Sequence, residues 1–167
     1  MTTLRERKDY AVRMFETAAK ELTGQDCIVE YAPEESRASD GRRIFGTMYK
    51  SLDRGKPIIR LYPREVDNPP KFLHTFVHEC AHVLLDGRSL RPISDESAQI
   101  DTPEATEAFV KQLAGPDEDK ADYLADAWLD EARKHIMPWQ VTNTAAMLRA
   151  LVNFHKEAER RIVNDEA

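Results

Sequence analysis

Apolar side chains recur at helical or strand spacing along most of this chain, and polar turns separate these stretches. Residues 3–22 have the spacing of an amphipathic helix, and Gly24 follows as a stop signal. Short apolar runs within residues 26–62 are typical of strands, and residues 33–41 between them read as a polar loop. The runs 43–50 and 58–62, joined by turn residues 53–57, predict a β-hairpin.

The second half of the chain has the pattern of successive helices. The spacing predicts helices over residues 71–85, 102–114, 117–136 and 142–163. Asp67-Asn68-Pro69-Pro70 indicates a turn before the first of them, and Gly115-Pro116 and Met137-Pro138 separate the later ones. We therefore expect one α+β domain over residues 1–167, mainly helical, with a small antiparallel or mixed sheet.

Composition narrows the classes of function. The 24 basic and 30 acidic residues leave a formal net charge of −6, which argues against strong nucleic-acid binding. No apolar run is long enough to cross a membrane, and the charged N-terminal residues lack the apolar core of a secretory signal. The two cysteines, Cys27 and Cys80, favour a reduced, cytoplasmic setting, because Cys80 lies where a disulfide would strain a helix. The oligomeric state is left open.

The residues that carry chemistry lie in the predicted helix 71–85. His78-Glu79-Cys80-Ala81-His82 is an H-E-x-x-H motif. His78 and His82 are four apart on one helix face, so both rings reach a single ion, and Zn²⁺ binds neutral imidazole readily. Glu79 is placed to take a proton from a water that the metal activates. The core-facing residues that we expect on this helix are Phe72, Phe76, Val77, Cys80, Ala81 and Leu84.

A catalytic zinc site usually has a third protein ligand. Asp86 and His74 continue the histidine stripe, but three ligands on consecutive turns of one straight helix span about 12 Å, too far for bonds of about 2 Å. A second element must therefore contribute. The acidic candidates near or after the motif are Asp86, Asp95, Glu96, Asp101, Glu104, Glu107, Asp117, Glu118, Asp119 and Asp122.

Glu118 and Asp122 lie four apart on one face of the predicted helix 117–136. One carboxylate of such a pair can bind zinc while the other accepts the N–H of a ligating histidine and orients its ring. Apolar residues on the same helix would pack it against the motif helix. These are Ala121, Leu124, Ala125, Trp128 and Leu129.

H-E-x-x-H followed by E-x-x-x-D on a second helix resembles the gluzincin arrangement of zinc peptidases. The stretch from Glu118 to Ala125 resembles the E-x-x-A-D-x-F-A stretch of the ImmA/IrrE-type metallopeptidases, and Thr75 and the pair Leu84-Leu85 match positions typical of that family. The resemblance spans residues 44–129. It implies a zincin-like metallopeptidase domain with Glu118 as third zinc ligand. We then expect Asp122 to be the carboxylate that orients a ligating histidine.

The expected function is that of a zinc-dependent peptidase with Glu79 as general base and a protein or peptide, such as one regulatory protein, as substrate. The alternative is a catalytically weak zinc-binding regulatory or interaction module of the same fold. The oxyanion donor is left open among Tyr49, Tyr62, Tyr123, His74 and His135. The strand 58–62 is a hypothetical site of substrate strand addition, and residues 95–107 read as a solvated loop or lid.

Overall fold

A computed structural model describes residues 4–32, 36–37, 43–62, 69–86, 92–96, 98, 118–140 and 143–166. Within these ranges, side chains are not described for residues 4–11, 36–37, 43, 69–70, 72, 86, 118 and 158–166. The predicted helix 102–114 lies outside the described residues.

The described residues form a mostly helical α+β fold, as the sequence predicts. The helices are α1 (Leu4–Thr23), α2 (Pro69–Asp86), α4 (Glu118–Arg133) and α5 (Thr144–Glu166), with a short 3-10 helix at Pro138–Gln140. The strands are β1 (Ile28–Tyr31), β2 (Ser36–Arg37), β3 (Arg43–Ile44), β4 (Gly46–Lys50) and β5 (Pro57–Leu61). None of the described helices is long and apolar enough to cross a membrane.

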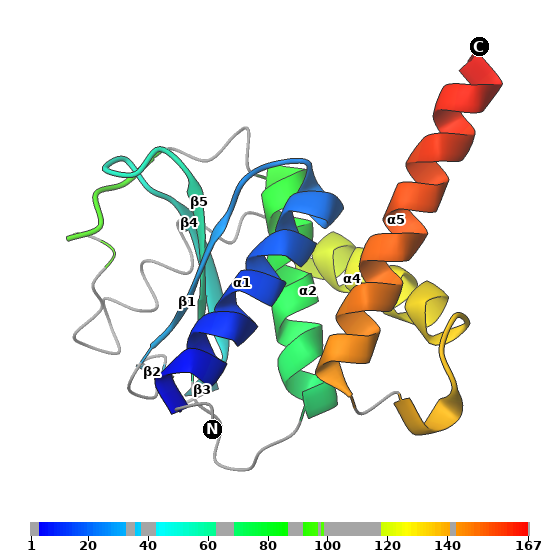
Figure 1. The fold of residues 1–167 in the computed structure, drawn as a ribbon. Coiled ribbons are helices and arrows are strands. Elements are labelled where there is room, and N and C mark those ends of the chain that lie inside the picture. The colour runs from blue at the N-terminus through cyan, green and yellow to red at the C-terminus, as the bar shows by residue number, and fades with distance from the viewer. Residues whose placement is uncertain are drawn as a thin grey trace.

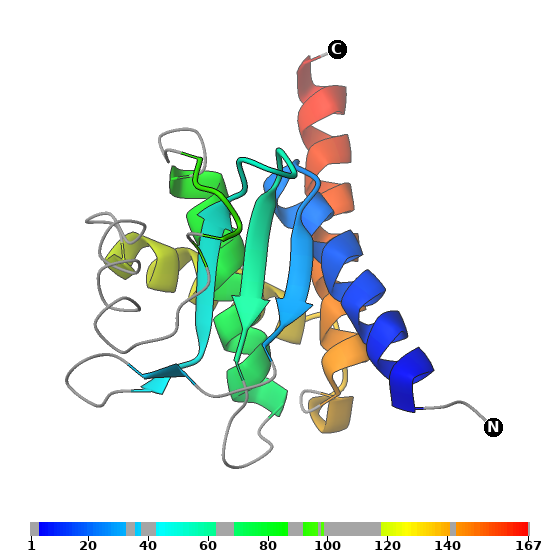
Figure 2. The ribbon, with the colours of Figure 1, turned by 90° about the vertical axis from the view of Figure 1, so that its left-hand side faces the viewer.

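Three strands form a small mixed sheet in the order β1-β5-β4. β4 and β5 are the predicted hairpin, antiparallel with Met48 opposite Ile59, while β1 runs parallel to β5. Helices α1 and α2 cover one face of this sheet, and α4 and α5 lie beyond them, as Figures 1 and 2 show. The metal-motif helix α2 is therefore the central helix, in contact with both the sheet and α4.

Alternation along the strands divides the buried side chains between the two faces of the sheet. Met48 and Ile59 face the helices and join the main core, whereas their neighbours Tyr49 and Ile58 form a small second cluster with Ala98. On α2, the buried residues include Phe76, Val77, Cys80 and Ala81, as predicted. The side chain of Phe72, which was also predicted to face the core, is not described.

The prediction that Leu84 faces the core is wrong. Leu84 is 46% exposed, whereas Val83 is fully buried. The packed face of the helix steps from Leu73 to Phe76, Cys80 and Val83 in steps of three and four, and that spacing turns position 84 toward solvent.

Other differences from the predicted elements have local causes. Pro69 and Pro70 begin α2 instead of forming a turn before it, because proline tolerates the first helical turn, where its missing N–H is not needed. The predicted loop 33–41 contains β2, which pairs with β3, a pairing of two residues per strand that is too short for periodicity to reveal. Asn143 caps α5 by accepting a hydrogen bond from the Ala146 N–H at 3.1 Å.

Candidate metal centre

Helix α2 brings the two motif histidines together. The Nε2 atoms of His78 and His82 lie 3.1 Å apart. Two nitrogens that each bind one tetrahedral zinc ion at about 2.0–2.1 Å are about 3.3 Å apart, so the observed spacing suits a shared ion. Two lone pairs at this distance repel unless a proton or a cation lies between them. The pair therefore has the spacing that two imidazole ligands of one zinc ion require, which is also the spacing of a hydrogen bond between the rings.

Asp122 of α4 contacts the ring of His78 from the other side. Its Oδ1 lies 2.7 Å from His78 Nδ1. The contact is an ion pair by distance and lies outside hydrogen-bond geometry. A carboxylate at this distance favours a proton on Nδ1, so a neutral His78 ring keeps its lone pair on Nε2, toward His82. The sequence-based role of Asp122 stays a prediction.

The side chain of Glu79, a residue of α2, packs against the edge strand β4. The residue is 7% exposed. At Gly46 of β4, an added Cβ would lie 2.7 Å from Thr75 Cγ2 and 3.2 Å from Glu79 Cγ. Only glycine allows the strand to come this close, which fits the rule that an isolated strand glycine marks a close backbone approach. The candidate base thus lies against the backbone of β4.

The third ligand is the part of the site that the geometry leaves unassigned. Helix α4 begins at Glu118, whose side chain is not described, so its role stays a prediction. Among the described residues, no group of three or more His, Cys, Asp and Glu side chains is arranged to hold a metal ion. Of the other candidates, Asp86 has no described side chain, and Asp101, Glu104, Glu107 and Asp117 lie outside the described residues.

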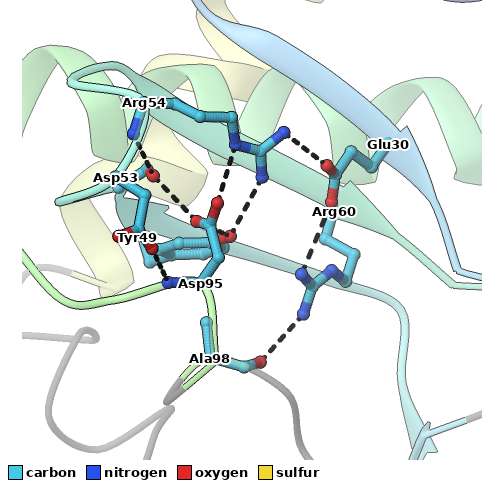
Figure 3. A network of polar contacts seen from close by, with 8 residues as sticks. Glu30, Tyr49, Asp53, Arg54, Arg60, Asp95 and Ala98 are labelled. Carbon is cyan, nitrogen blue, oxygen red and sulfur yellow. Dashed lines mark hydrogen bonds and ion pairs between the residues drawn. The ribbon is translucent and has the colours of Figure 1, made fainter.

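Asp95 is not a suitable metal ligand, because its carboxylate makes a set of hydrogen bonds on the face of the sheet opposite α2. Its carboxylate accepts hydrogen bonds from Ser51 Oγ at 2.7 Å, Tyr49 Oη at 2.9 Å and Arg54 Nε at 3.0 Å. Arg54 also donates to Glu30 Oε1 at 2.8 Å. We call this the sheet-side network, and Figure 3 shows it. It comprises Glu30, Tyr49, Ser51, Asp53, Arg54, Asp95, Arg60 and the carbonyl of Ala98.

The same network bears on the prediction that residues 95–107 form a solvated loop or lid, of which the structure describes only residues 95, 96 and 98. Ile93 forms a parallel bridge with Ser51 next to the end of β4, and the backbone N–H of Asp95 donates to Asp53 Oδ2 at 2.7 Å. Ala98 is fully buried, and its carbonyl accepts a hydrogen bond from Arg60 at 2.9 Å. The described part of the segment is thus fastened to the sheet.

Two candidate oxyanion donors are engaged elsewhere. Tyr49 is buried and donates to Asp95, and burial is the main reason that the pKa of its phenol is raised. His74 Nε2 lies 2.9 Å from Asp126 Oδ1, a carboxylate that the sequence reasoning did not select. Asp126 lies four residues after Asp122, so continuing the carboxylate stripe by one turn would have found it.

The strand-addition hypothesis for residues 58–62 is wrong. β5 lies between β1 and β4 and therefore has no open edge, whereas β4 is the edge strand. Cys80 is fully buried, as predicted, and burial raises the pKa of its thiol well above the usual value. Cys27 and Cys80 are both free thiols.

Comparisons of the chain with protein-family models, curated proteins and solved structures find no match.

Proposed function

We propose that this chain is a zinc-dependent peptidase with a gluzincin-like site. The observation that carries the proposal is the convergence of His78 Nε2 and His82 Nε2 at 3.1 Å, with Asp122 holding the Nδ1 of His78. This donor set suits zinc, which prefers neutral imidazole nitrogens whose other ring N–H is bound by a carboxylate.

The register of the two helices supports Glu118 as third ligand. Asp126 contacts His74 and Asp122 contacts His78, so a step of four residues back along α4 matches a step of four residues forward along α2. One further step pairs His82 with Glu118, the first residue of α4. A carboxylate at that position approaches the ion from a second helix, as a site with two ligands on α2 requires.

Glu79 is the general base of the proposed reaction. A zinc ion held by His78, His82 and Glu118 would supply Lewis-acid chemistry, which polarises a peptide carbonyl and lowers the pKa of a water. Glu79 would accept the proton of that water and return it to the leaving amine. The edge strand β4 is the proposed docking element for an extended substrate, because Gly46 brings its backbone against Glu79.

Metal content and cleavage of the Glu79→Gln variant test the proposal together. We expect the purified wild type to hold about one zinc ion per chain and to cleave peptides from a mixed fluorogenic library. Glu79→Gln should keep the zinc and lose activity by about 10²- to 10⁴-fold. Glu131→Gln is the matched control, because Glu131 pairs with Lys134, the residue that follows the end of α4.

Two outcomes contradict the proposal in different ways. A wild type that takes up no zinc removes the metal centre altogether. Equal cleavage by Glu79→Gln and wild type removes the peptidase mechanism, and zinc binding with no cleavage by the wild type favours the regulatory alternative.

A further inference from the structure

A second histidine–carboxylate contact lies one helical turn from the candidate metal centre. His74 Nε2 and Asp126 Oδ1 are 2.9 Å apart, and His78 Nδ1 and Asp122 Oδ1 are 2.7 Å apart. Both contacts join α2 to α4, and each partner is displaced by four residues from its counterpart. His74 itself is not needed as a ligand, because its Nε2 faces Asp126 and the stripe geometry already excludes three ligands from one helix.

We infer that the pair His74–Asp126 is a positioning pair that sets the register of α4 on α2 and thereby the metal affinity of the site. The inference rests on the proposed zinc site. It assigns no bond to the metal from either residue. Their effect passes through Asp122 and the first turn of α4.

The buried side chains beside Asp122 and Asp126 are small, whereas the larger buried side chains of α4, Trp128 and Leu129, lie further along the helix. Ala121 and Ala125 are fully buried. Alanine allows two helices to approach closely but interlocks less than larger side chains that fill grooves. The hydrogen bond of His74 with Asp126 and the ion pair of His78 with Asp122 add directional contacts at this part of the interface.

The two contacts differ mainly in the exposure of their histidines. The side chain of His78 is 13% exposed and that of His74 is 39% exposed, whereas Asp122 and Asp126 are 56% and 65% exposed. Exposed pairs of this kind contribute little to overall stability. A displacement of α4 by about 1 Å, however, is large beside metal–ligand bonds of about 2 Å. The pair is therefore expected to affect metal affinity far more than folding.

Zinc affinity measured by competition with a chromophoric chelator tests this inference. Asp126→Ala and His74→Ala should each weaken zinc binding about tenfold, the lower end of the range for groups that orient metal ligands. The double variant should be no weaker than either single variant, because both remove one contact. Asp126→Asn should bind nearly as tightly as wild type, since its amide oxygen still accepts the N–H of His74.

Asp130→Ala is the matched control. It removes the same charge from α4 one turn further on, and the Asp130 side chain, 68% exposed, pairs with Arg133 in its own helix. Its zinc affinity should equal that of wild type. The absorption spectrum of the Co²⁺-substituted proteins gives a second readout, and it should change for Asp126→Ala and not for Asp130→Ala.

The outcomes separate this inference from the proposed function. Wild type that binds zinc, with Asp126→Ala and His74→Ala binding equally well, overturns the positioning role alone. Equal weakening by Asp126→Ala and Asp130→Ala also overturns it, because charge rather than contact would then be responsible. Wild type that binds no zinc overturns both. Urea unfolding of the metal-free proteins checks that each variant is folded, and His74→Ala stands in if Asp126→Ala is not.

Discussion

Two polar clusters hold distant segments of this chain together, and they differ in the kinds of groups that they bring together. The sheet-side network joins β1, β4 and the segment around Asp95, and its two arginines donate to Glu30, Asp95, Tyr49 and a carbonyl. The helix-pair cluster joins α2 to α4. It comprises His74, His78, His82, Asp122 and Asp126.

In the sheet-side network, the arginine, tyrosine and serine donors meet carboxylate, hydroxyl or carbonyl acceptors. In the helix-pair cluster, Asp126 lies beside His74 Nε2 and Asp122 beside His78 Nδ1, and the Nε2 atoms of His78 and His82 lie 3.1 Å apart. Two ring nitrogens at that distance share a proton or suit a common ion. The comparison favours a structural role for the sheet-side network and supports the proposed metal site at the helix-pair cluster.

The largest effect that this comparison predicts comes from removing one of the two converging nitrogens. His82→Ala should lower zinc affinity by more than about a hundredfold, because it deletes a ligand and not merely an orienting group. Equilibrium dialysis followed by elemental analysis measures the loss. His135→Ala is the control, since His135 is exposed and its ring lies beside Phe154, 6.1 Å away between centroids. Equal zinc content in the two variants would refute the site.

The sequence was sufficient to predict the parts of this site that depend on local spacing. Histidines at i and i+4 must share a helix face, and the same rule aligns Glu118 with Asp122 on the next helix. The sequence also predicted the hairpin of β4 and β5, because these two strands are close in the chain. Asp126 follows from the same spacing, but its significance depends on the register between helices, which no local pattern encodes.

Contacts between segments far apart in the chain were beyond the reach of the sequence. Asp95 meets Ser51 across 44 residues, and nothing in the surrounding polar stretch distinguishes it from its acidic neighbours. The parallel pairing of β1 with β5 likewise depends on how α1 packs, and it was this pairing that removed the open edge expected for β5. Nonlocal pairing decides which edge of the sheet is open.

A smaller effect is expected from Asp122, which orients a ligand but is not itself predicted to bind the metal. Asp122→Ala should reduce zinc affinity by about 10- to 100-fold, because the His78 ring loses the acceptor that fixes its tautomer. Chelator competition measures the change. Asp119→Ala, an exposed acid on the same turn of α4, should leave the affinity at the wild-type value. If both variants weaken binding equally, Asp122 acts only through the charge of the helix.

Gly46 links the helix-pair side of the fold to the sheet. Gly46→Ala places a Cβ 2.7 Å from Thr75 Cγ2, which should lower the free energy of unfolding by about 1–3 kcal/mol, as overpacking does. Urea denaturation measures the loss. Thr75→Ser in the same chain removes that methyl group and keeps the hydroxyl that donates to the Lys71 carbonyl at 3.1 Å, so the double variant should recover much of the stability. Failure of the double variant to recover would point to Glu79 as the source of the clash.

The smallest effect at the metal centre is expected from the sheet-side network, where substitution should change stability and leave zinc binding alone. Hydrogen bonds from Ser51 first, and from Tyr49 and Arg54, hold the pKa of Asp95 below its usual value. An acid whose pKa is lowered on folding stabilises the folded state above its unfolded pKa of about 3.9, and that stabilisation is lost as the pH falls through the folded value.

Wild type should therefore exceed Asp95→Asn in stability at neutral pH, and the difference should shrink as the pH falls below about 4. Denaturant unfolding at a series of pH values measures this difference. Zinc affinity of Asp95→Asn at pH 7 should match wild type, because Asp95 lies across the sheet from α2 and is paired with Arg54. A large loss of zinc in this variant would make the two clusters parts of one site. The distinction between a structural network and a metal-binding cluster would then fail for this protein.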